Sequence, residues 1–305
     1  MAAVKPDWLK VRMPGGERYG KIKSRARDLK LHTVCEEAQC PNIGECWGSG
    51  TATFMVLGDT CTRGCRFCAV STARNPPPPD PAEPANVAHA IHEMDLDYVV
   101  VTSVNRDDLD DQGAGHFAAC IRTIRERNPR TLVEVLIPDF RGRLDLLDVV
   151  LDARPDVLAH NVETVPRLQQ PVRDPRASWA QSMDILAGAK RGGADRLTKT
   201  SIQVGHGETE DEIVDTMRAL RAIDVDFLTL GQYLRPSMTH LPVREFVRPE
   251  VFERLGEVGR AMGFRYVASG PLVRSSYRAG EFFIAEHLRG RASSEETTSN
   301  PGETP

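Results

Sequence analysis

Short apolar runs rich in β-branched residues alternate with longer segments of helical periodicity through most of the chain. Near-continuous apolar runs separated by helices are typical of parallel strands that are covered on both faces. The predicted strands are 53–57, 97–102, 132–137, 157–160, 197–204, 225–230 and 265–268. The predicted helices are 86–95, 113–127, 143–153, 175–191, 209–222 and 249–262. This alternation predicts an α/β fold, and it suits a full or partial TIM-type barrel better than a small doubly wound sheet.

The segments before and after the alternating strands and helices have a different composition. Residues 10–30 carry eight lysines and arginines against two acidic residues. Such a run is usually solvated surface, but it also suits docking of an acidic partner. Residues 291–305 contain no large apolar residue, so we expect a disordered tail. Within the pattern, Thr209 and Glu212 form the signature of a capping box at the start of one helix.

The overall composition predicts a folded, cytoplasmic protein. The chain has 305 residues, of which 40% are hydrophobic, and its formal net charge is −4. A general nucleic-acid binder would be strongly basic, so we expect no nucleic-acid partner. No apolar run approaches the ~18 residues that crossing a bilayer requires. The first ten residues have neither the apolar stretch of a secretion signal nor the Arg- and Ser-rich composition of a transit peptide, so we expect a cytoplasmic location. We therefore expect no membrane association.

The cysteines give the strongest chemical signal in the chain. There are seven, an odd number, so complete internal disulfide pairing is excluded. Six of them form two triads, Cys35-x4-Cys40-x5-Cys46 and Cys61-x3-Cys65-x2-Cys68. Clustered thiols in a cytosolic protein indicate metal binding or redox chemistry. The seventh, Cys120, lies in a helical pattern and is expected to be a small buried apolar residue.

The spacing of the triads leaves two kinds of metal site open. Structural zinc prefers four protein ligands in two pairs, although six thiolates could share a binuclear zinc site. An iron–sulfur cube usually takes four thiolates, so a triad leaves one iron available for another ligand. These ligand counts favour iron–sulfur clusters. The second triad follows the first predicted strand, which places it at the mouth of the barrel where TIM-type active sites are built.

The second triad resembles the signature of the radical SAM superfamily. The matching segment is CTRGCRFC (61–68), with Phe67 before the last cysteine. The resemblance implies that Cys61, Cys65 and Cys68 hold a [4Fe–4S] cluster whose fourth iron binds S-adenosylmethionine (SAM). It further implies that the reduced cluster cleaves SAM to a 5′-deoxyadenosyl radical, which removes hydrogen from unactivated C–H bonds.

The first triad and several later segments resemble the lipoyl synthase family. The matching segments are CEEAQCPNIGECW (35–47), VNRDD (104–108), HNVETVP (160–166), QYLRPS (232–237) and GPLVRSSY (270–277). The resemblance implies an auxiliary [4Fe–4S] cluster on Cys35, Cys40 and Cys46, with a serine oxygen on its fourth iron. Ser276 is the expected ligand and Ser275 the alternative, while the structural alternative for Ser276 is a cap on a helix at 277–288.

The family resemblance implies an architecture and an activity. The architecture is a partial (β/α)6 barrel of TIM type at 51–270, with an auxiliary-cluster segment at 1–50, a C-terminal segment at 271–290 and a tail at 291–305. The activity is insertion of two sulfur atoms, at C6 and C8, into a protein-bound octanoyl-lysine. The auxiliary cluster is expected to supply the sulfur.

Five residues are expected to contact SAM: Phe67, Arg106, Asn161, Glu163 and Lys199. The polar residues among them follow predicted strands or lie within one. Three of them also have a structural interpretation. Arg106 begins an acidic loop, Glu163 could form a turn or a cap, and Lys199 could belong to a buried ion pair.

The resemblance also implies partners and leaves two alternative functions. The expected partners are octanoylated carrier domains (the E2 subunits of 2-oxoacid dehydrogenases and the H protein of glycine cleavage), a flavodoxin or ferredoxin as reductant, and an iron–sulfur carrier protein. One alternative is another radical SAM enzyme, such as a methylthiotransferase or a sulfur inserter like biotin synthase. The other is a zinc-binding module without enzymatic activity.

Overall fold

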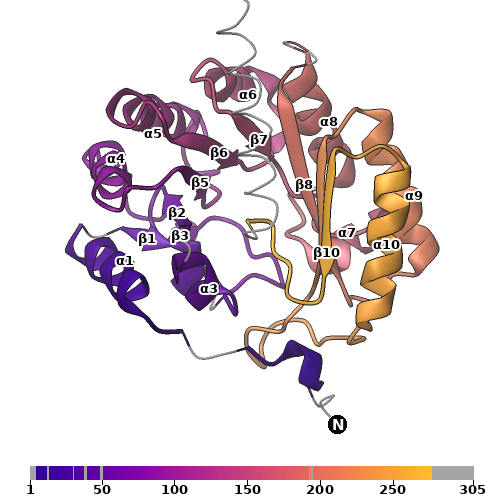
Figure 1. The fold of residues 1–305 in the computed structure, drawn as a ribbon. Coiled ribbons are helices and arrows are strands. Elements are labelled where there is room, and N and C mark those ends of the chain that lie inside the picture. Colours follow the sequence, from indigo (N-terminus) through magenta and orange to yellow (C-terminus); the bar gives the residue numbers. More distant parts are fainter. Residues whose placement is uncertain are drawn as a thin grey trace, which may run out of the picture.

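The fold is an eight-stranded curved sheet surrounded by helices (Figure 1). The computed structural model describes residues 5–11, 14–29, 31–37, 40–48, 51–191, 193 and 195–276. The strands lie in the order β1-β2-β5-β6-β7-β8-β9-β10, and all pairs are parallel except β1 with β2. Their bounds are β1 His32–Thr33, β2 Ala52–Val56, β5 Tyr98–Ser103, β6 Leu132–Leu136, β7 Val157–Ala159, β8 Leu197–Val204, β9 Phe227–Gln232 and β10 Tyr266–Gly270. Within the described residues, no pairing joins β1 to β10, so the barrel is open.

A long helix follows each parallel strand except the last and lies on the outer side of the sheet, and the short helix α7 (Gln169–Val172) precedes α8 (Figure 1). The long helices are α4 Glu83–Glu93, α5 Ala114–Arg127, α6 Leu144–Leu151, α8 Trp179–Lys190, α9 Glu210–Ala222 and α10 Pro249–Ala261. The capping box predicted at the start of α9 is present in full, with Thr209 and Glu212 bonding each other's backbone. The predicted order of strands and helices is confirmed, and so is the partial barrel of TIM type.

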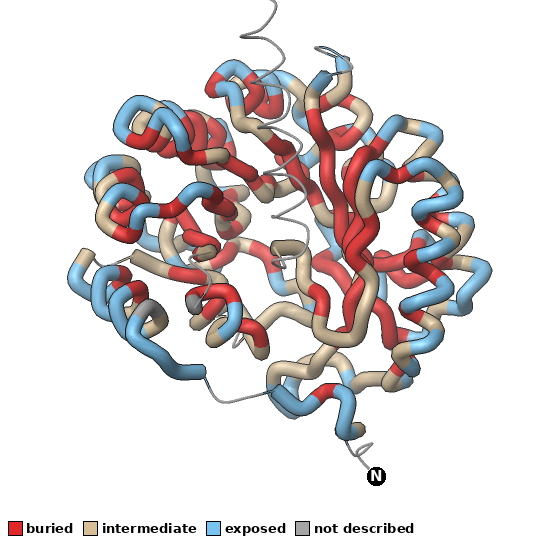
Figure 2. Tube along the Cα trace, in the orientation of Figure 1, coloured by how far each residue is buried: buried red, intermediate tan, exposed pale blue. Residues whose placement is uncertain are grey.

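The core lies on both faces of the sheet. Every residue of β2, β7 and β9 is buried, because the strands face the barrel interior on one side and the helices on the other. Figure 2 shows the buried strands inside a ring of helices whose outer faces are exposed. No helix in the described ranges is both long and apolar enough to cross a membrane.

The basic N-terminal stretch contains a helix that the sequence pattern did not predict. Helix α1 (Glu17–Asp28) packs against α3 (Ile43–Gly48), and between the two the Tyr19 ring lies 5.1 Å from the ring of Trp47. Ile22 and Trp47 are buried in the same core as the barrel strands. Between these helices lies α2 (Val34–Glu37). The segment that carries the first cysteine triad is thus anchored to the barrel by apolar packing.

Several predictions fall outside the described residues. They concern the helix at 277–288, the tail at 291–305 and most of the C-terminal segment at 271–290. The division of the chain at residues 50 and 270 also remains a prediction.

Candidate functional site

Both cysteine triads line one cavity of about 560 Å³. The cavity lies at the carboxyl ends of the parallel strands, since residues at or just beyond these ends contribute to its wall. They include Ser103, Leu136, His160, Gln203 and Gln232. The mouth of a barrel is where side chains from several strands converge, so the position expected for the second triad is the observed one.

The second triad lies on a loop that is closed at its base by a small parallel sheet. Strand β3 (Thr60–Cys61) pairs with β4 (Ser71–Thr72). Backbone N–H groups of the loop itself and of two other segments point at two of its sulfurs. Cys61 Sγ accepts from the amides of Arg63 and Asn105 at 3.4 and 3.3 Å, and Cys65 Sγ accepts from the amide of Asp174 at 3.4 Å. Hydrogen bonds of this kind stabilise thiolate charge and tune iron–sulfur clusters, so the loop fits such a group.

Buried charges hold this loop in place. The Arg63 guanidinium, 3% exposed, donates to Asp107 at 2.9 Å and to Asp139 at 2.8 Å. Burial alone would raise the pKa of Asp107, but its bonds from Arg63 outweigh burial and lower the pKa to about 2. Asp174 accepts from the amide of Gly64 at 2.8 Å, which fixes the loop on its other side.

The first triad lies on two short helices and the turn between them. Cys35 belongs to α2, Cys46 to α3, and the amide of Cys40 donates to the carbonyl of Cys35 at 3.0 Å. The side chain of Asn42 donates to the carbonyl of Leu272 at 2.6 Å. This contact joins the triad to the C-terminal segment.

The C-terminal segment brings an arginine and two serines to the cavity. Arg274, Ser275 and Ser276 all line it. Burial raises the pKa of the Cys40 thiol, and the amide of Asn42 and the charge of Arg274 act in the opposite direction. The structure therefore brings the two predicted serine ligands to the same cavity as the first triad.

Two thiols of the second triad, those of Cys65 and Cys68, are strongly desolvated. Burial raises the pKa of Cys65 to about 11 and that of Cys68 to about 12. None of the seven cysteines, all of which lie in described residues, forms a disulfide. Because a buried thiolate requires compensating positive charge, the sulfur-rich donor set fits iron, which binds thiolates and displaces their protons.

Three of the five predicted SAM contacts line the cavity: Phe67, Asn161 and Glu163. The buried Oδ1 of Asn161 has no hydrogen-bond partner in the described part of the chain, so it can accept from a bound ligand. Glu163 accepts from Nε2 of Gln203 at 2.7 Å, and burial raises the pKa of its carboxyl.

The other two predicted contacts are not part of the described cavity wall. Lys199 is 1% exposed, and its Nζ lies 2.8 and 2.9 Å from the two carboxylate oxygens of Glu134. The hydroxyl of Tyr98 also donates to Glu134, at 2.5 Å. Arg106 pairs with Asp108 at 2.8 Å. The geometry thus favours the structural interpretations of Lys199 and Arg106, because both cations already have carboxylate partners.

A cation that the sequence analysis did not single out lies in the cavity instead. Arg173 lines the wall, and its positive charge acts on both Glu163 and Cys65. Its Nη1 donates to Gln169 at 2.9 Å and to the hydroxyl of Ser182 at 2.8 Å. Arg173 lies in an irregular stretch before a predicted helix, where the sequence offers no periodic signal.

Solved structures share the fold at low sequence identity. Methylornithine synthase matches with a TM-score of 0.54 and 14% identity, covering 83% of this chain and 72% of that one. HydG, a maturase of the [FeFe]-hydrogenase, matches with a TM-score of 0.56 and 14% identity, covering 81% and 54%. These similarities concern the fold alone.

Curated relatives are much more similar in sequence. Mitochondrial lipoyl synthase of Rattus norvegicus is 60% identical over 284 residues, covering 92% of this chain and 76% of its own. Mitochondrial lipoyl synthase 1 of Pisum sativum is 59% identical over 286 residues, with the same coverage. The enzyme of Homo sapiens is 56% identical over 284 residues. These relatives favour neither a zinc-binding module nor another radical SAM activity.

The relatives also correct one expectation. A cytoplasmic location was predicted because the first ten residues lack the features of a targeting signal. That prediction is contradicted, since these relatives are named as mitochondrial enzymes.

Family sequence models match the two parts of the chain that carry the triads. The model of the radical SAM superfamily matches residues 55–220, which include the second triad. The model of the N-terminal domain of lipoyl synthase matches residues 2–40, which include Cys35 and Cys40. Membership of the superfamily implies a [4Fe–4S] cluster and SAM. Together with the relatives, these matches show that the chain belongs to the lipoyl synthase family of radical SAM enzymes.

Proposed function

We propose that the protein converts an octanoyl-lysine on a lipoyl-carrier protein into the lipoyl group by inserting sulfur at C6 and C8. The observation that carries this proposal is the single cavity lined by both cysteine triads. An enzyme that generates a radical on a carbon and then delivers sulfur to it needs both groups within reach of one bound chain. One cavity for both triads meets that requirement.

The cysteines divide into two ligand sets in this proposal. Cys61, Cys65 and Cys68 hold the cluster that binds SAM. Cys35, Cys40 and Cys46, with Ser276, hold the auxiliary cluster. When bound, the first cluster supplies the electron that cleaves SAM and the second supplies sulfur. A serine oxygen is a hard ligand on an otherwise soft site, so Ser276 is the ligand that leaves most readily.

Asn161, Glu163 and Arg173 orient SAM. The unpartnered oxygen of Asn161 and the carboxylate of Glu163 accept hydrogen bonds from its amino or hydroxyl groups. Arg173, whose charge acts on Glu163, binds the carboxylate of SAM in place of Lys199, the lysine that the sequence suggested as a SAM contact. Phe67 offers an aromatic face beside the cluster ligands.

The remaining wall suits an acyl chain. It includes the apolar side chains of Val34, Met55, Val70, Ile202 and Leu234. These side chains hold the octanoyl group by excluding water from it, which also protects a carbon radical from other hydrogen donors.

The partners in this proposal are those that the lipoyl synthase family implies. The substrate carriers are the E2 subunits of 2-oxoacid dehydrogenases and the H protein, a flavodoxin or ferredoxin supplies electrons, and an iron–sulfur carrier restores the auxiliary cluster. Helix α1 presents Lys21, Lys23 and Arg25 to an acidic carrier, although Arg25 also pairs with Glu93 at 3.0 Å. Reversing these three charges is expected to raise the KM for the carrier and to weaken its salt dependence.

An anaerobic assay tests the proposed function. The reconstituted enzyme is given SAM, a strong reductant and a peptide that carries octanoyl-lysine. In the expected product, one hydrogen at C6 and one at C8 are each replaced by sulfur, as measured by mass spectrometry. A methylthio product, or SAM cleavage that leaves the peptide unchanged, would refute the proposal.

A further inference from the structure

The chain makes a strained turn between β2 and the loop of the second triad. Leu57, which follows the last residue of β2, has a φ of +69° and is 2% exposed. Gly58 follows with a φ of +87°. A bulky residue rarely adopts the left-handed region, so neighbouring contacts must hold Leu57 there. Cys61 lies four residues after Leu57, so this turn determines where the loop begins.

Three contacts hold Leu57: one to its N–H group, one to its carbonyl and one to its side chain. Its N–H donates to Glu83 Oε2 at 2.7 Å, and its carbonyl accepts from Arg106 Nη1 at 3.2 Å. Its side chain lies against Gly113, where a Cβ would come within 2.4 Å of the Leu57 Cδ1. Gly113 is thus needed for this close approach, and both polar groups of the strained residue have charged partners.

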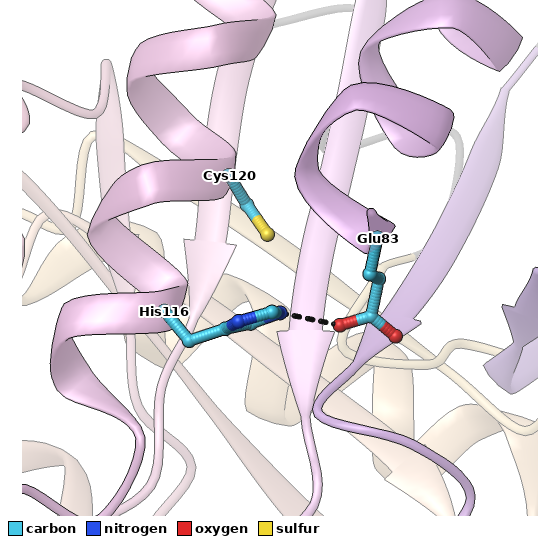
Figure 3. Close-up of side chains that lie close together, drawn as sticks. All are labelled: Glu83, His116 and Cys120. Carbon is cyan, nitrogen blue, oxygen red and sulfur yellow. Dashed lines mark hydrogen bonds and ion pairs between the residues drawn. The ribbon is translucent and has the colours of Figure 1, made fainter. Parts of the chain in front are cut away.

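The two charged partners are themselves fixed. Glu83 is the first residue of α4, and its Oε2 also lies 2.7 Å from Nε2 of His116 on α5 (Figure 3). Arg106 is held by Asp108 through two bonds of 2.9 and 2.8 Å. The turn is therefore tied to α4, to α5 and to the loop after β5.

We propose that Glu83, His116 and Arg106 are positioning residues that hold the Leu57 turn and thereby fix the loop carrying Cys61, Cys65 and Cys68. This proposal rests on the assignment of that loop to the SAM-binding cluster. It also gives the Arg106–Asp108 pair a function, since Arg106 reaches the loop through the carbonyl of Leu57 rather than through SAM.

A metal ion is the competing interpretation of the same residues. Ligand atoms of Glu83, His116 and Cys120 all lie within 4.8 Å of one another (Figure 3). Oε2 of Glu83, however, already accepts from Leu57 and pairs with His116. Burial and the charge of Glu83 also raise the pKa of the Cys120 thiol, which opposes a metal-binding thiolate. The geometry therefore favours a hydrogen-bonded clamp.

Hydrogen–deuterium exchange of the reconstituted holoprotein tests the clamp. Glu83→Ala is expected to speed exchange of the peptide that contains the Leu57 amide about tenfold, and to speed loss of cluster iron to a chelator. Glu83→Gln keeps a carbonyl acceptor and is expected to restore both. His89→Ala is the matched control, because His89 also joins α4 to α5, through a 3.0 Å bond to Arg127. Unchanged exchange in Glu83→Ala, or equal acceleration in His89→Ala, would overturn the proposal.

Two further variants keep the test decisive if Glu83→Ala does not fold. His116→Ala retains the carboxylate but removes its partner, so about threefold faster exchange is expected, and unchanged exchange would count against the clamp. Cys120→Ala is expected to change neither exchange nor metal content. About one zinc per wild-type chain that disappears in Cys120→Ala would establish the metal site instead. The two proposals can fail separately. If the variants show the expected exchange pattern but the wild-type protein makes no lipoyl product, the proposed function is refuted and the clamp is still supported.

Discussion

The side-chain amide of Asn42 donates a 2.6 Å hydrogen bond to the carbonyl oxygen of Leu272, 230 residues away in sequence. Asn42 is 4% exposed and lies between Cys40 and Cys46. Leu272 lies four residues before Ser276. The contact therefore brings together the three cysteines, which precede the parallel strands of the barrel in sequence, and the serine, which follows them.

Replacing Asn42 is expected to damage the auxiliary site selectively. Asn42→Ala leaves the Leu272 carbonyl without this donor, at a cost of about 1 kcal/mol. We expect lower iron content and less lipoyl product, while SAM cleavage continues. Iron analysis and product assays measure these effects, with the exposed Asn75→Ala as control. Wild-type iron content and product yield in Asn42→Ala would show that the contact is dispensable.

Breaking the buried ion pair beneath the second triad is expected to destabilise the protein. The Asp107 side chain is 4% exposed and pairs with Arg63, which is equally buried. Asp107→Asn leaves Arg63 with only Asp139 and should cost about 3 kcal/mol of unfolding free energy. Urea unfolding measures this cost. Asp145→Asn, which breaks an exposed pair with Arg143, is the control and is expected to change little.

Replacing Arg173 is expected to change the KM for SAM, whereas replacing Lys199 is expected to change the stability of the fold. Arg173→Ala removes the cation proposed for the SAM carboxylate, so the KM for SAM should rise at least tenfold. Lys199→Met leaves the Glu134 carboxylate buried without its cation, which should lower stability by about 3 kcal/mol and leave the KM for SAM nearly unchanged. Steady-state kinetics and urea unfolding of both variants separate the two roles. The reverse pattern would restore the role expected from the sequence.

The sequence predicted the barrel well because its strands carry a local signal. Runs such as Tyr98–Ser103 are apolar on both faces, and each is followed by a helical period. The cysteine spacings are local signals too. Helix α1 was missed because its charged residues outnumber the few that pack, such as Ile22, and only contact with Trp47 reveals its buried face.

The polar residues of the site were harder to predict because their roles depend on distant partners. A lysine in a strand, such as Lys199, suggests a ligand contact until Glu134, two strands away in the sheet, accounts for its charge. Arg173 has no strand or helix pattern around it, and only the fold brings it to Glu163. Leu57 shows nothing unusual in sequence, since a positive φ depends on the contacts that impose it.

Buried histidine makes stability depend on pH. His160 bonds the carbonyl of Ile137 through Nδ1 and the hydroxyl of Ser182 through Nε2, both at 2.9 Å. Burial, reinforced by the charge of Arg173, lowers its pKa from 6.5 to about 4. Between pH 6.5 and 4, the imidazole therefore binds a proton in the unfolded chain but stays neutral in the folded chain. Stability should therefore be full above pH 6.5 and fall by about 3 kcal/mol as the pH approaches 4.

Urea unfolding across this pH range measures the effect. His160→Asn removes the titrating group, so its unfolding free energy should decline less steeply between pH 6.5 and 4 than that of the wild type. Equal slopes in the two proteins would show that His160 does not titrate in this way.

The most direct test of two clusters at one cavity is the iron and sulfide content after anaerobic reconstitution. We expect about eight iron and eight sulfide ions per wild-type chain, and about four of each when Cys35, Cys40 and Cys46 are all replaced by alanine. The triple variant should still cleave SAM but form no lipoyl product. Four iron ions or bound zinc in the wild type, or lipoyl product from the triple variant, would contradict the proposed pair of clusters.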